Sequence, residues 1–272
     1  VDAESKIQNP KSKIRVLASS RILITGASSG IGRALAVELG RAGGRLALIA
    51  RREAELRRVA DDVASAGGEA VPVPGDITVK LVRRAALEAA EERFGGLDIL
   101  VNNAGVSAWG RFDAAGEERL RRIMEVNFFA LAEMTREALP LLIRGRRPLV
   151  VNIASILAHR GIPYQAEYCA SKFAVRGFSE ALRPELKRLG IDLLVVSPGT
   201  TESEFFEHLL EKTAEMPWGR QRGVPAERVA AQIARAMRTG KHEIVPSARG
   251  KVLVWLNRLF PRCVDAWVAR YG

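Results

Sequence analysis

The chain has 272 residues, and 47% of them are hydrophobic, which is enough to bury one large core in a single domain. Its net charge of +11 suits an acidic partner, but the arginines lack the interleaved aromatic residues of a nucleic-acid groove, so we expect a solvated basic surface and no nucleic acid. Two cysteines give no disulfide framework, and three scattered histidines predict no metal site.

The first 20 residues are interpreted as a mobile or docking extension. They lack the apolar core of a signal peptide, and the low cysteine content is typical of a reducing compartment, so we expect a cytoplasmic protein. The main domain is predicted over residues 21–250, with a helical tail over 251–272.

Seven short apolar runs are interpreted as buried strands. Their continuous apolar character is typical of a parallel sheet covered on both faces. Apolar residues recur at helical spacing between them, and glycine pairs at 43–44 and 67–68 mark two expected helix ends. The alternation predicts an α/β fold, a doubly wound, mostly parallel sheet of about seven strands with helices on both faces. The predicted strands are 22–24, 46–49, 71–73, 97–101, 149–153, 191–196 and 243–245.

A glycine-rich turn follows the first predicted strand and opens a helix. Glycines allow a tight turn and close backbone approach, and the unpaired amides of a helix N-terminus attract a pyrophosphate. This setting is the one that a dinucleotide site requires, although a simple tight turn is the alternative. The residues expected to bind the cofactor are Gly26, Ser28, Ser29, Gly30, Ile31 and Gly32.

The end of the second predicted strand carries Arg51 and Arg52 where an acidic residue would bind an unmodified ribose. Two guanidinium groups suit the 2′-phosphate of NADP(H), with Arg51 the expected contact. Ordinary surface arginines are the alternative. Open α/β sheets bind ligands at the carboxyl ends of their strands, so further cofactor contacts are assigned after the third and fourth strands. These are Asp76, for the adenine amino group, with Ile77, and then Asn103, Ala104 and Gly105.

Tyr168 and Lys172 are four residues apart in a predicted helix and therefore share one face. An ammonium group near a phenol favours its ionised form, which makes a group with a pKa normally near ~10 usable as an acid or base. An ordinary half-buried tyrosine is the alternative. Pro184 is expected to kink the same helix about one turn before its end.

The ordered set of motifs resembles the classical short-chain dehydrogenase/reductase family over about residues 20–250. The resemblance implies a Rossmann fold and a homodimer or homotetramer. The motifs are the glycine turn from Thr25 to Gly32, Asn102-Asn103-Ala104-Gly105, Asn127, Ser155, Tyr168-x-x-x-Lys172 and Pro198-Gly199.

The same resemblance implies a role for each catalytic residue. Tyr168 exchanges a proton with the substrate oxygen, and Ser155 hydrogen-bonds that oxygen. Lys172 binds the nicotinamide ribose and lowers the Tyr168 pKa, while Asn127 holds a water that links Lys172 to solvent. Pro198, Gly199 and Ser203 complete the cofactor contacts. The family usually has Thr at the position of Ser203, and Thr200 and Thr201 compete for that role.

Two segments are expected to shape the substrate pocket. Residues 156–165 should form one wall, in which His159 and Arg160 either face solvent or meet an anionic group. Residues 203–218 are predicted to form an inserted helix within a lid over about 201–225, with apolar residues that favour a hydrophobic ketone or aldehyde. The apolar residues of this segment are Phe205, Phe206, Leu209, Leu210 and Trp218.

The tail over 251–272 keeps apolar residues on helical faces across Pro261, beside several basic residues. This predicts an amphipathic helix pair that packs on the pocket or on a neighbouring subunit. Peripheral contact with a membrane is the alternative, because the segment is too interrupted to span a bilayer.

Together these features predict an NADP(H)-dependent oxidoreductase that transfers hydride between nicotinamide and a carbonyl or secondary alcohol. A 3-oxoacyl-(acyl-carrier-protein) reductase is the nearest alternative, since a basic surface suits an acidic carrier, but residues 106–110 look unlike that group. A non-catalytic NADP(H)-sensing protein is a further alternative, which the intact Ser155, Tyr168 and Lys172 disfavour.

Overall fold

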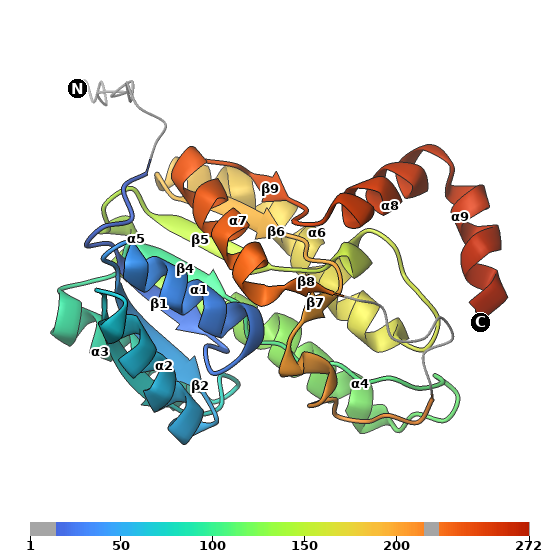
Figure 1. The fold of residues 1–272 in the computed structure, drawn as a ribbon, viewed down its shortest axis with the longest axis horizontal. Coiled ribbons are helices and arrows are strands. Elements are labelled where there is room, and N and C mark those ends of the chain that lie inside the picture. The colour runs from blue at the N-terminus through green and yellow to red at the C-terminus, as the bar shows by residue number, and fades with distance from the viewer. Residues whose placement is uncertain (1–14, 215–222, 272) are drawn as a thin grey trace, which may run out of the picture.

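A single parallel sheet of seven strands runs through the molecule in the order β3-β2-β1-β4-β5-β6-β9 (Figure 1). The computed structural model describes residues 15–214 and 223–271. The chain builds outward from β1 to β3 and then crosses to β4 on the other side, which is the predicted doubly wound topology. All seven predicted strands are confirmed. They are β1 (Arg21–Thr25), β2 (Arg45–Ala50), β3 (Glu69–Pro74), β4 (Ile99–Asn102), β5 (Leu149–Ile153), β6 (Asp192–Val196) and β9 (Glu243–Ile244).

Helices cover both faces of the sheet, as predicted. Successive strand residues point to opposite faces, so Ile22 and Ile24 pack with one helical layer and Leu23 packs with the other. Burying each such side chain contributes about 1.5–3 kcal/mol, and together they fix the sheet between its two layers. The first layer consists of α1 (Gly30–Arg41), α2 (Glu53–Ser65) and α7 (Ala226–Thr239), and the second of α3 (Lys80–Phe94), α5 (Ala130–Ile143) and α6 (Ala166–Arg188).

Helix ends follow the glycines of the sequence. α1 ends at Arg41, just before Gly43 (φ +74°), and α2 ends at Ser65, before Gly67 (φ +98°). A left-handed backbone suits glycine and stops helix propagation. α6 continues without a break through Pro184, where a kink was predicted, and ends four residues later.

The described part of the predicted N-terminal extension is docked on the domain. Arg15 is 4% exposed, and its guanidinium group donates to the carbonyl oxygens of Arg147 (3.0 Å) and Met237 (2.9 Å). It also pairs with Asp192 at 3.0 Å. Residues 15–20 are therefore part of the domain, and residues 1–14 lie outside the described part of the chain.

The predicted helix over 203–218 is wrong as far as the structure describes it. Only a short 3-10 turn, Glu204–Phe206, forms, and the chain then runs extended beside residues 107–109. The amides of Leu210 and Thr213 donate to the carbonyl oxygens of Ser107 and Trp109, each at 2.8 Å. Hydrogen bonds to a distant loop have replaced those of a helix. Trp218 lies outside the described residues.

The base of this insertion is closed by two short strands, β7 (Thr201–Glu202) and β8 (Val224–Pro225), which pair in parallel. The tail forms the predicted helix pair, α8 (Ala248–Leu259) and α9 (Pro261–Val268), followed by a 3-10 turn, Ala269–Tyr271. Proline at the first position of α9 needs no amide partner there, so it starts the second helix. Figure 1 shows α8 and α9 projecting from the domain as an arm.

Candidate active site

The predicted functional residues gather at the carboxyl ends of the strands, around one cavity of about 1380 Å³. Two predicted residues, Gly32 and Asn127, are buried behind its wall. The others line it: Gly26, Ser28, Ser29, Gly30, Ile31, Arg51, Arg52, Asp76, Ile77, Asn103, Ala104, Gly105, Ser155, Tyr168, Lys172, Pro198, Gly199 and Ser203.

The glycine turn forms a cradle that side chains would fill. Gly26 has φ +66°, and a Cβ atom there would lie 2.7 Å from the Cα atom of Ala104. The Asn103 amide fixes the turn by donating to the carbonyl oxygens of Thr25 (3.0 Å) and Gly26 (2.9 Å). Ser29 precedes α1 without a side-chain capping bond, and Ser29, Gly30 and Ile31 line the cavity, so uncapped amides of the first helical turn stand beside it as anion donors. These residues fit the pyrophosphate of a dinucleotide cofactor.

The two arginines after β2 have different surroundings. Arg52 pairs with Glu204 at 3.0 Å and lies 3.0 Å from Nε2 of His208, so it is bound to the segment after β7. Arg51 is exposed, and within residues 15–214 and 223–271 it forms no ion pair. Three arginines line the cavity, and Arg122 is paired with Asp76, so Arg51 is the one whose guanidinium group is not held by a carboxylate within the described residues.

Asp76 lines the cavity but has internal partners. Its carboxylate accepts hydrogen bonds from the Thr78 amide (3.0 Å) and hydroxyl (2.8 Å) and pairs with Arg122 at 2.7 Å. Burial raises the pKa of Asp76, but the hydrogen bonds from Thr78 and Arg122 outweigh burial, so the net pKa lies below its usual value. An ionised Asp76 remains able to accept a further hydrogen bond from a ligand.

Tyr168, Ser155 and Lys172 meet where β5 ends and α6 begins. The Ser155 hydroxyl oxygen accepts from the Leu157 amide at 3.1 Å, and Ser155 hydrogen-bonds the Tyr168 phenol. The Lys172 ammonium donates to the carbonyl oxygen of Ile153 at 3.0 Å and lies 5.7 Å from the centroid of the Tyr168 ring. The predicted helix face holds Tyr168 and Lys172, and Ser155, which follows β5, brings the third polar group to the same part of the cavity.

Burial disfavours charge on both members of the Tyr168–Lys172 pair. It raises the pKa of Tyr168 more than the hydrogen bond from Ser155 lowers it. It also lowers the pKa of Lys172 to about 8. The predicted lowering of the Tyr168 pKa is therefore not found in the protein alone, because burial dominates and Lys172 donates to Ile153. A protonated phenol is the form that a proton donor needs.

Asn127 lies on a π-helical turn, Glu125–Phe129, between α4 (Glu117–Met124) and α5. Its amide donates to the Val106 carbonyl oxygen and to the Ser171 hydroxyl, both at 2.9 Å, and its oxygen accepts from the Val106 amide at 2.8 Å. A Cβ atom on Gly105 would lie 3.3 Å from Oδ1 of Asn127 and 3.6 Å from Nζ of Lys172. The lack of a side chain at Gly105 thus leaves Asn127 and Lys172 facing the same space. The π-turn was not apparent from the sequence.

The three hydroxyl groups considered for the nicotinamide amide all line the cavity. Thr201 donates to the carbonyl oxygen of Gly199 at 3.1 Å, and the Ser203 hydroxyl oxygen accepts from the Phe205 amide at 3.4 Å. A Cβ atom on Gly30 would lie 3.1 Å from Cβ of Ser203, so Ser203 sits directly over the glycine cradle. This position supports Ser203 over Thr200 for the cofactor contact.

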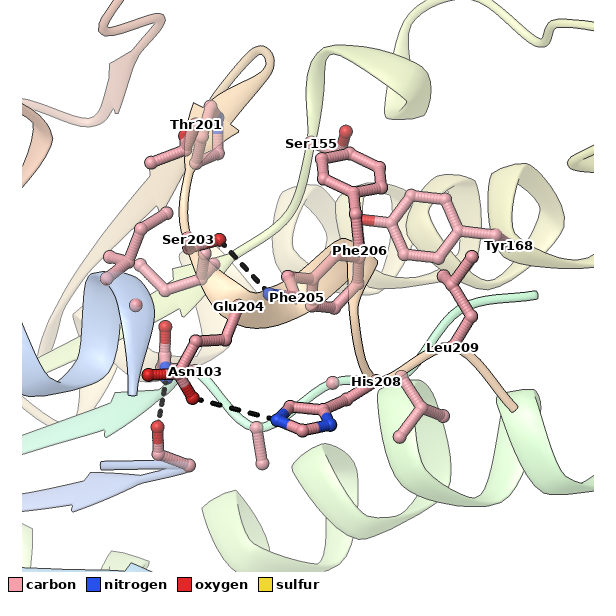
Figure 2. A pocket seen from close by; sticks show the side chains of 18 of the residues that line it. Asn103, Ser155, Tyr168, Thr201, Ser203, Glu204, Phe205, Phe206, His208 and Leu209 are labelled. Atoms are coloured by element: carbon pink, nitrogen blue, oxygen red, sulfur yellow. Dashed lines mark hydrogen bonds and ion pairs between the residues drawn. The ribbon is translucent and has the colours of Figure 1, made fainter. Parts of the chain in front are cut away.

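Apolar side chains form the rest of the cavity wall. Figure 2 shows the segment that carries Phe205 and Phe206 beside Tyr168, and the Phe205 and Tyr168 ring centroids are 6.0 Å apart. The predicted wall over 156–165 contributes Ile156, Leu157, Ile162 and Gln165. Leu253, Trp267 and Val268 also line the cavity, as expected if the tail packs on the pocket. The sequence did not identify three further wall residues, Val106, Trp109 and Val126.

His159 and Arg160 neither line this cavity nor simply face solvent. The His159 ring lies 3.1 Å from the Ser197 hydroxyl and 3.3 Å from the Glu243 carboxylate. Arg160 pairs with Asp265 of α9 at 2.5 Å. The prediction that they simply face solvent is wrong, and the anionic groups that they meet are carboxylates of the protein, Glu243 of β9 and Asp265 of the arm.

A buried ion pair supports the catalytic helix from behind. Arg119 of α4 donates to Glu167 at 2.6 and 2.9 Å, next to Tyr168, and contacts Glu211 of the extended segment at 3.3 Å. The Arg119 and Glu167 side chains are only 3% and 4% exposed. No spacing in the sequence indicated this pair, since its members are 48 positions apart.

Neither a metal cluster nor a spanning helix is found in the described segments. No three His, Cys, Asp or Glu side chains there are grouped to hold an ion. None of the helices described is long and apolar enough to cross a membrane.

Comparison with known proteins connects this geometry to a family. The family model described as short chain dehydrogenase matches residues 20–214. An uncharacterized oxidoreductase of Bacillus subtilis, YxnA, is 31% identical over 95% of this chain and 75% of its own length. A 3-ketodihydrosphingosine reductase of Bacteroides thetaiotaomicron is 37% identical over 69% of this chain, and the match covers 66% of that protein. Human dehydrogenase/reductase SDR family member 7 is 36% identical over 70% of this chain and 57% of its own length.

Solved structures share the fold and hold nicotinamide cofactors. A short-chain dehydrogenase/reductase of Burkholderia phymatum in complex with NAD has a TM-score of 0.83 at 25% identity, covering 90% of this chain and 95% of its own. A Burkholderia cenocepacia short chain dehydrogenase with NADP has a TM-score of 0.75 at 28% identity, covering 85% and 97%. A Brucella melitensis 3-ketoacyl-(acyl-carrier-protein) reductase with NADH has a TM-score of 0.75 at 29% identity, covering 84% and 96%. These matches support a nicotinamide cofactor without selecting its phosphorylation state.

Proposed function

The chain belongs to the short-chain dehydrogenase family, and on that basis we propose that it is an NADP(H)-dependent reductase of hydrophobic ketones or aldehydes. One observation carries the proposal. A single cavity joins the glycine cradle to an apolar wall, and the Tyr168 phenol lies between them beside Ser155 and Lys172. In a parallel α/β sheet this edge is where a cofactor and its substrate meet.

Residues of the protein donate the proton and stabilise the negative charge that develops on the substrate oxygen. The bound cofactor supplies or accepts the hydride. Tyr168, protonated at neutral pH, donates its proton to the carbonyl oxygen, and the Ser155 hydroxyl hydrogen-bonds the same oxygen. Negative charge develops there only as the reaction proceeds, so both donors stabilise the transition state more than the bound substrate. Lys172, with a pKa of about 8, can return a proton toward Tyr168 near neutral pH.

The preference for NADP(H) is argued from Arg51 and Arg52. No acidic residue stands directly after β2, and the Arg51 guanidinium at the cavity is not held by a carboxylate within the described residues. A 2′-phosphate would gain a charge-assisted hydrogen bond from it, whereas an unmodified ribose would find no carboxylate directly after β2 to accept from its hydroxyl groups.

The hydrophobic substrate class is argued from the wall opposite the cradle, where Phe205, Phe206, Leu209 and Trp267 line the cavity. The relative named 3-ketodihydrosphingosine reductase supports a ketone. The structural neighbour named 3-ketoacyl-(acyl-carrier-protein) reductase favours a second candidate, a 3-oxoacyl thioester on an acidic carrier. A homodimer or homotetramer and a cytoplasmic location remain predictions.

The test follows NADPH oxidation by the purified protein against a panel of aliphatic and aromatic ketones, aldehydes and a 3-oxoacyl thioester, with NADH run in parallel. We expect turnover with apolar ketones and NADPH, and a loss of roughly 10²–10⁴-fold in kcat for Tyr168→Phe, because the proton donor is gone. Tyr164→Phe, a tyrosine that does not line the cavity, is the matched control and should retain activity. Unchanged turnover in Tyr168→Phe, or none with any carbonyl compound, would contradict the proposal.

A further inference from the structure

The helix α8 presents an apolar stripe to solvent. Val252, Trp255, Leu256 and Leu259 follow one another at helical spacing and are 57%, 60%, 45% and 58% exposed. The opposite side of the helix, at Gly250, Leu253 and Asn257, faces the domain. Scattered exposed apolar residues are ordinary, but a continuous stripe that contains Trp marks an interaction surface.

Positive charge surrounds this stripe. The arm from Ala248 onward has five basic residues and one acidic residue, Asp265, which is already paired with Arg160. Lys251 and Arg258 are seven residues apart and follow one edge of the stripe. Within the described ranges none of the five basic residues forms an ion pair: Arg249, Lys251, Arg258, Arg262 and Arg270, all exposed.

We propose that the arm formed by α8 and α9 docks on an anionic lipid surface, with the α8 stripe entering the headgroup boundary and the basic residues contacting lipid phosphates. A helix pair with Trp and Leu on one face and Lys or Arg along its edges has the composition of an interfacial segment. A second copy of the chain is a poorer occupant, because a symmetric contact would bring the two sets of five positive charges together.

The inner side of the same arm belongs to the cavity. Leu253, Trp267 and Val268 line the cavity wall, and Asn257 donates to the carbonyl oxygen of His159 at 2.9 Å. The arm is therefore tied to the loop that follows Ser155, and only one layer of helix separates the outer stripe from the cavity. A carbonyl compound dissolved in the bilayer would reach the cavity across this layer, a step that rests on the proposed function.

Docking is tested by flotation of the full chain with phosphatidylcholine vesicles, with and without phosphatidylglycerol. We expect the protein to float only with the anionic vesicles, and less at high salt. Trp255→Glu/Leu259→Glu should reduce partitioning by more than about tenfold, because it places carboxylates in the apolar phase. Leu81→Glu is the matched control, since Leu81 is 74% exposed on α3, away from the arm.

A second variant, Lys251→Gln/Arg258→Gln, removes charge without adding any and should weaken binding to anionic vesicles alone. Circular dichroism and NADPH binding show that each variant is folded. The inference is overturned if the wild type does not float with the anionic vesicles and stays in the lipid-free fractions. It is also overturned if Leu81→Glu loses as much binding as the arm variants. It is also overturned if the arm variants change only the size of the particle in gel filtration, since the stripe then joins two copies.

Activity separates this inference from the proposed function. A water-soluble ketone should be reduced equally by the wild type and Trp255→Glu/Leu259→Glu, while a long-chain ketone held in anionic vesicles should be reduced at least several-fold faster by the wild type. Flotation without turnover of any ketone would leave the docking surface in place and remove the reductase. Turnover of the soluble ketone without flotation would support the reductase and overturn the docking surface.

Discussion

At the scale of single residues, the Tyr168 and Lys172 pair is governed by burial. Both side chains are removed from water at the cavity wall, so the phenol holds its proton more tightly and the amine less tightly than in water. The pair is thus poised to pass a proton to a substrate oxygen near neutral pH, without a permanent buried charge on Tyr168.

The lowered pKa of Lys172 predicts a pH-dependent stability. Its pKa falls from 10.5 to about 8 on folding, so between these values the unfolded chain binds more protons than the folded protein, and stability rises with pH. Relative to Lys172→Met, the wild type should gain up to about 3 kcal/mol from pH 8 to 10.5 and nothing below pH 8. Urea unfolding of both proteins across this range measures the difference. A difference that does not vary with pH would show that Lys172 is not desolvated.

Arg51 predicts the cofactor preference. Arg51→Gln should raise the KM for NADPH by roughly 10–100-fold and leave the KM for NADH unchanged, because a charge-assisted bond to the 2′-phosphate is lost. Steady-state kinetics with the two cofactors gives the comparison. Arg58→Gln, an exposed arginine on α2 that does not line the cavity, is the control. An equal rise in the KM for NADPH and for NADH would show that Arg51 does not contact the 2′-phosphate.

At the scale of elements, Arg119 joins three segments that are far apart in the sequence. It connects α4 to the start of α6 through Glu167 and to the extended lid segment through Glu211. The site therefore depends on a contact behind it, in which a buried charge is satisfied by two carboxylates.

Breaking this contact should destabilise the protein. Arg119→Met leaves Glu167 buried and unpaired and should lower the free energy of unfolding by about 3–5 kcal/mol. Arg57→Met removes an exposed pair with Glu53 and should change it by less than about 1 kcal/mol. Chemical denaturation compares the two variants. Equal losses would mean that the Arg119 network is no stronger than a surface pair.

The elements that the sequence predicted correctly are those with local signals. The strands are short apolar runs, and α1 and α2 end where glycines allow a left-handed backbone. The lid helix was predicted from the spacing of Phe205, Phe206 and Leu209, but apolar residues that line a cavity from a 3-10 turn and an extended segment give the same spacing. The partner that decided the outcome, Trp109, is about one hundred residues away.

The same limit applies to the site. Motifs identified Ser155, Tyr168, Lys172 and the glycine cradle, because cofactor chemistry restricts residue type at those positions. Nothing local indicated that His159 would be held by Ser197 and Glu243. Tertiary contacts of this kind depend on which strands become neighbours, here β5, β6 and β9, and become visible only when the sheet is assembled.

At the scale of the whole molecule, the carboxyl ends of the strands form the site, whereas the amino ends carry contacts that stabilise the fold. The cavity lies at the carboxyl ends of the strands. At the amino ends, Arg21 and Asp98 form a buried pair at 2.6 Å, and Arg15 closes the same edge against Asp192 and Met237. Charged contacts at this end stabilise the fold without touching the cofactor or substrate.

Arg15→Met should therefore separate stability from activity. Loss of its hydrogen bonds leaves Met237 and Arg147 carbonyl oxygens without their donor, and we expect a cost of about 2–4 kcal/mol. The KM for NADPH, measured well below the unfolding temperature, should not change. Arg93→Met, from an exposed pair with Glu69, is the control for stability. A raised KM in Arg15→Met would show that the two ends of the sheet are coupled.

The order of the cavity residues along the sequence has a consequence for the design of hybrid enzymes. The glycine cradle, Arg51 and Asp76 all come before residue 106, whereas the apolar wall is formed by residues from 106 onward, namely 106–126, 156–165, the segment after β7 and the arm. Nearly every wall residue that meets the substrate's apolar part can thus be transplanted as one contiguous block from a relative. A hybrid built this way should inherit its cofactor from one parent and its choice of substrate from the other.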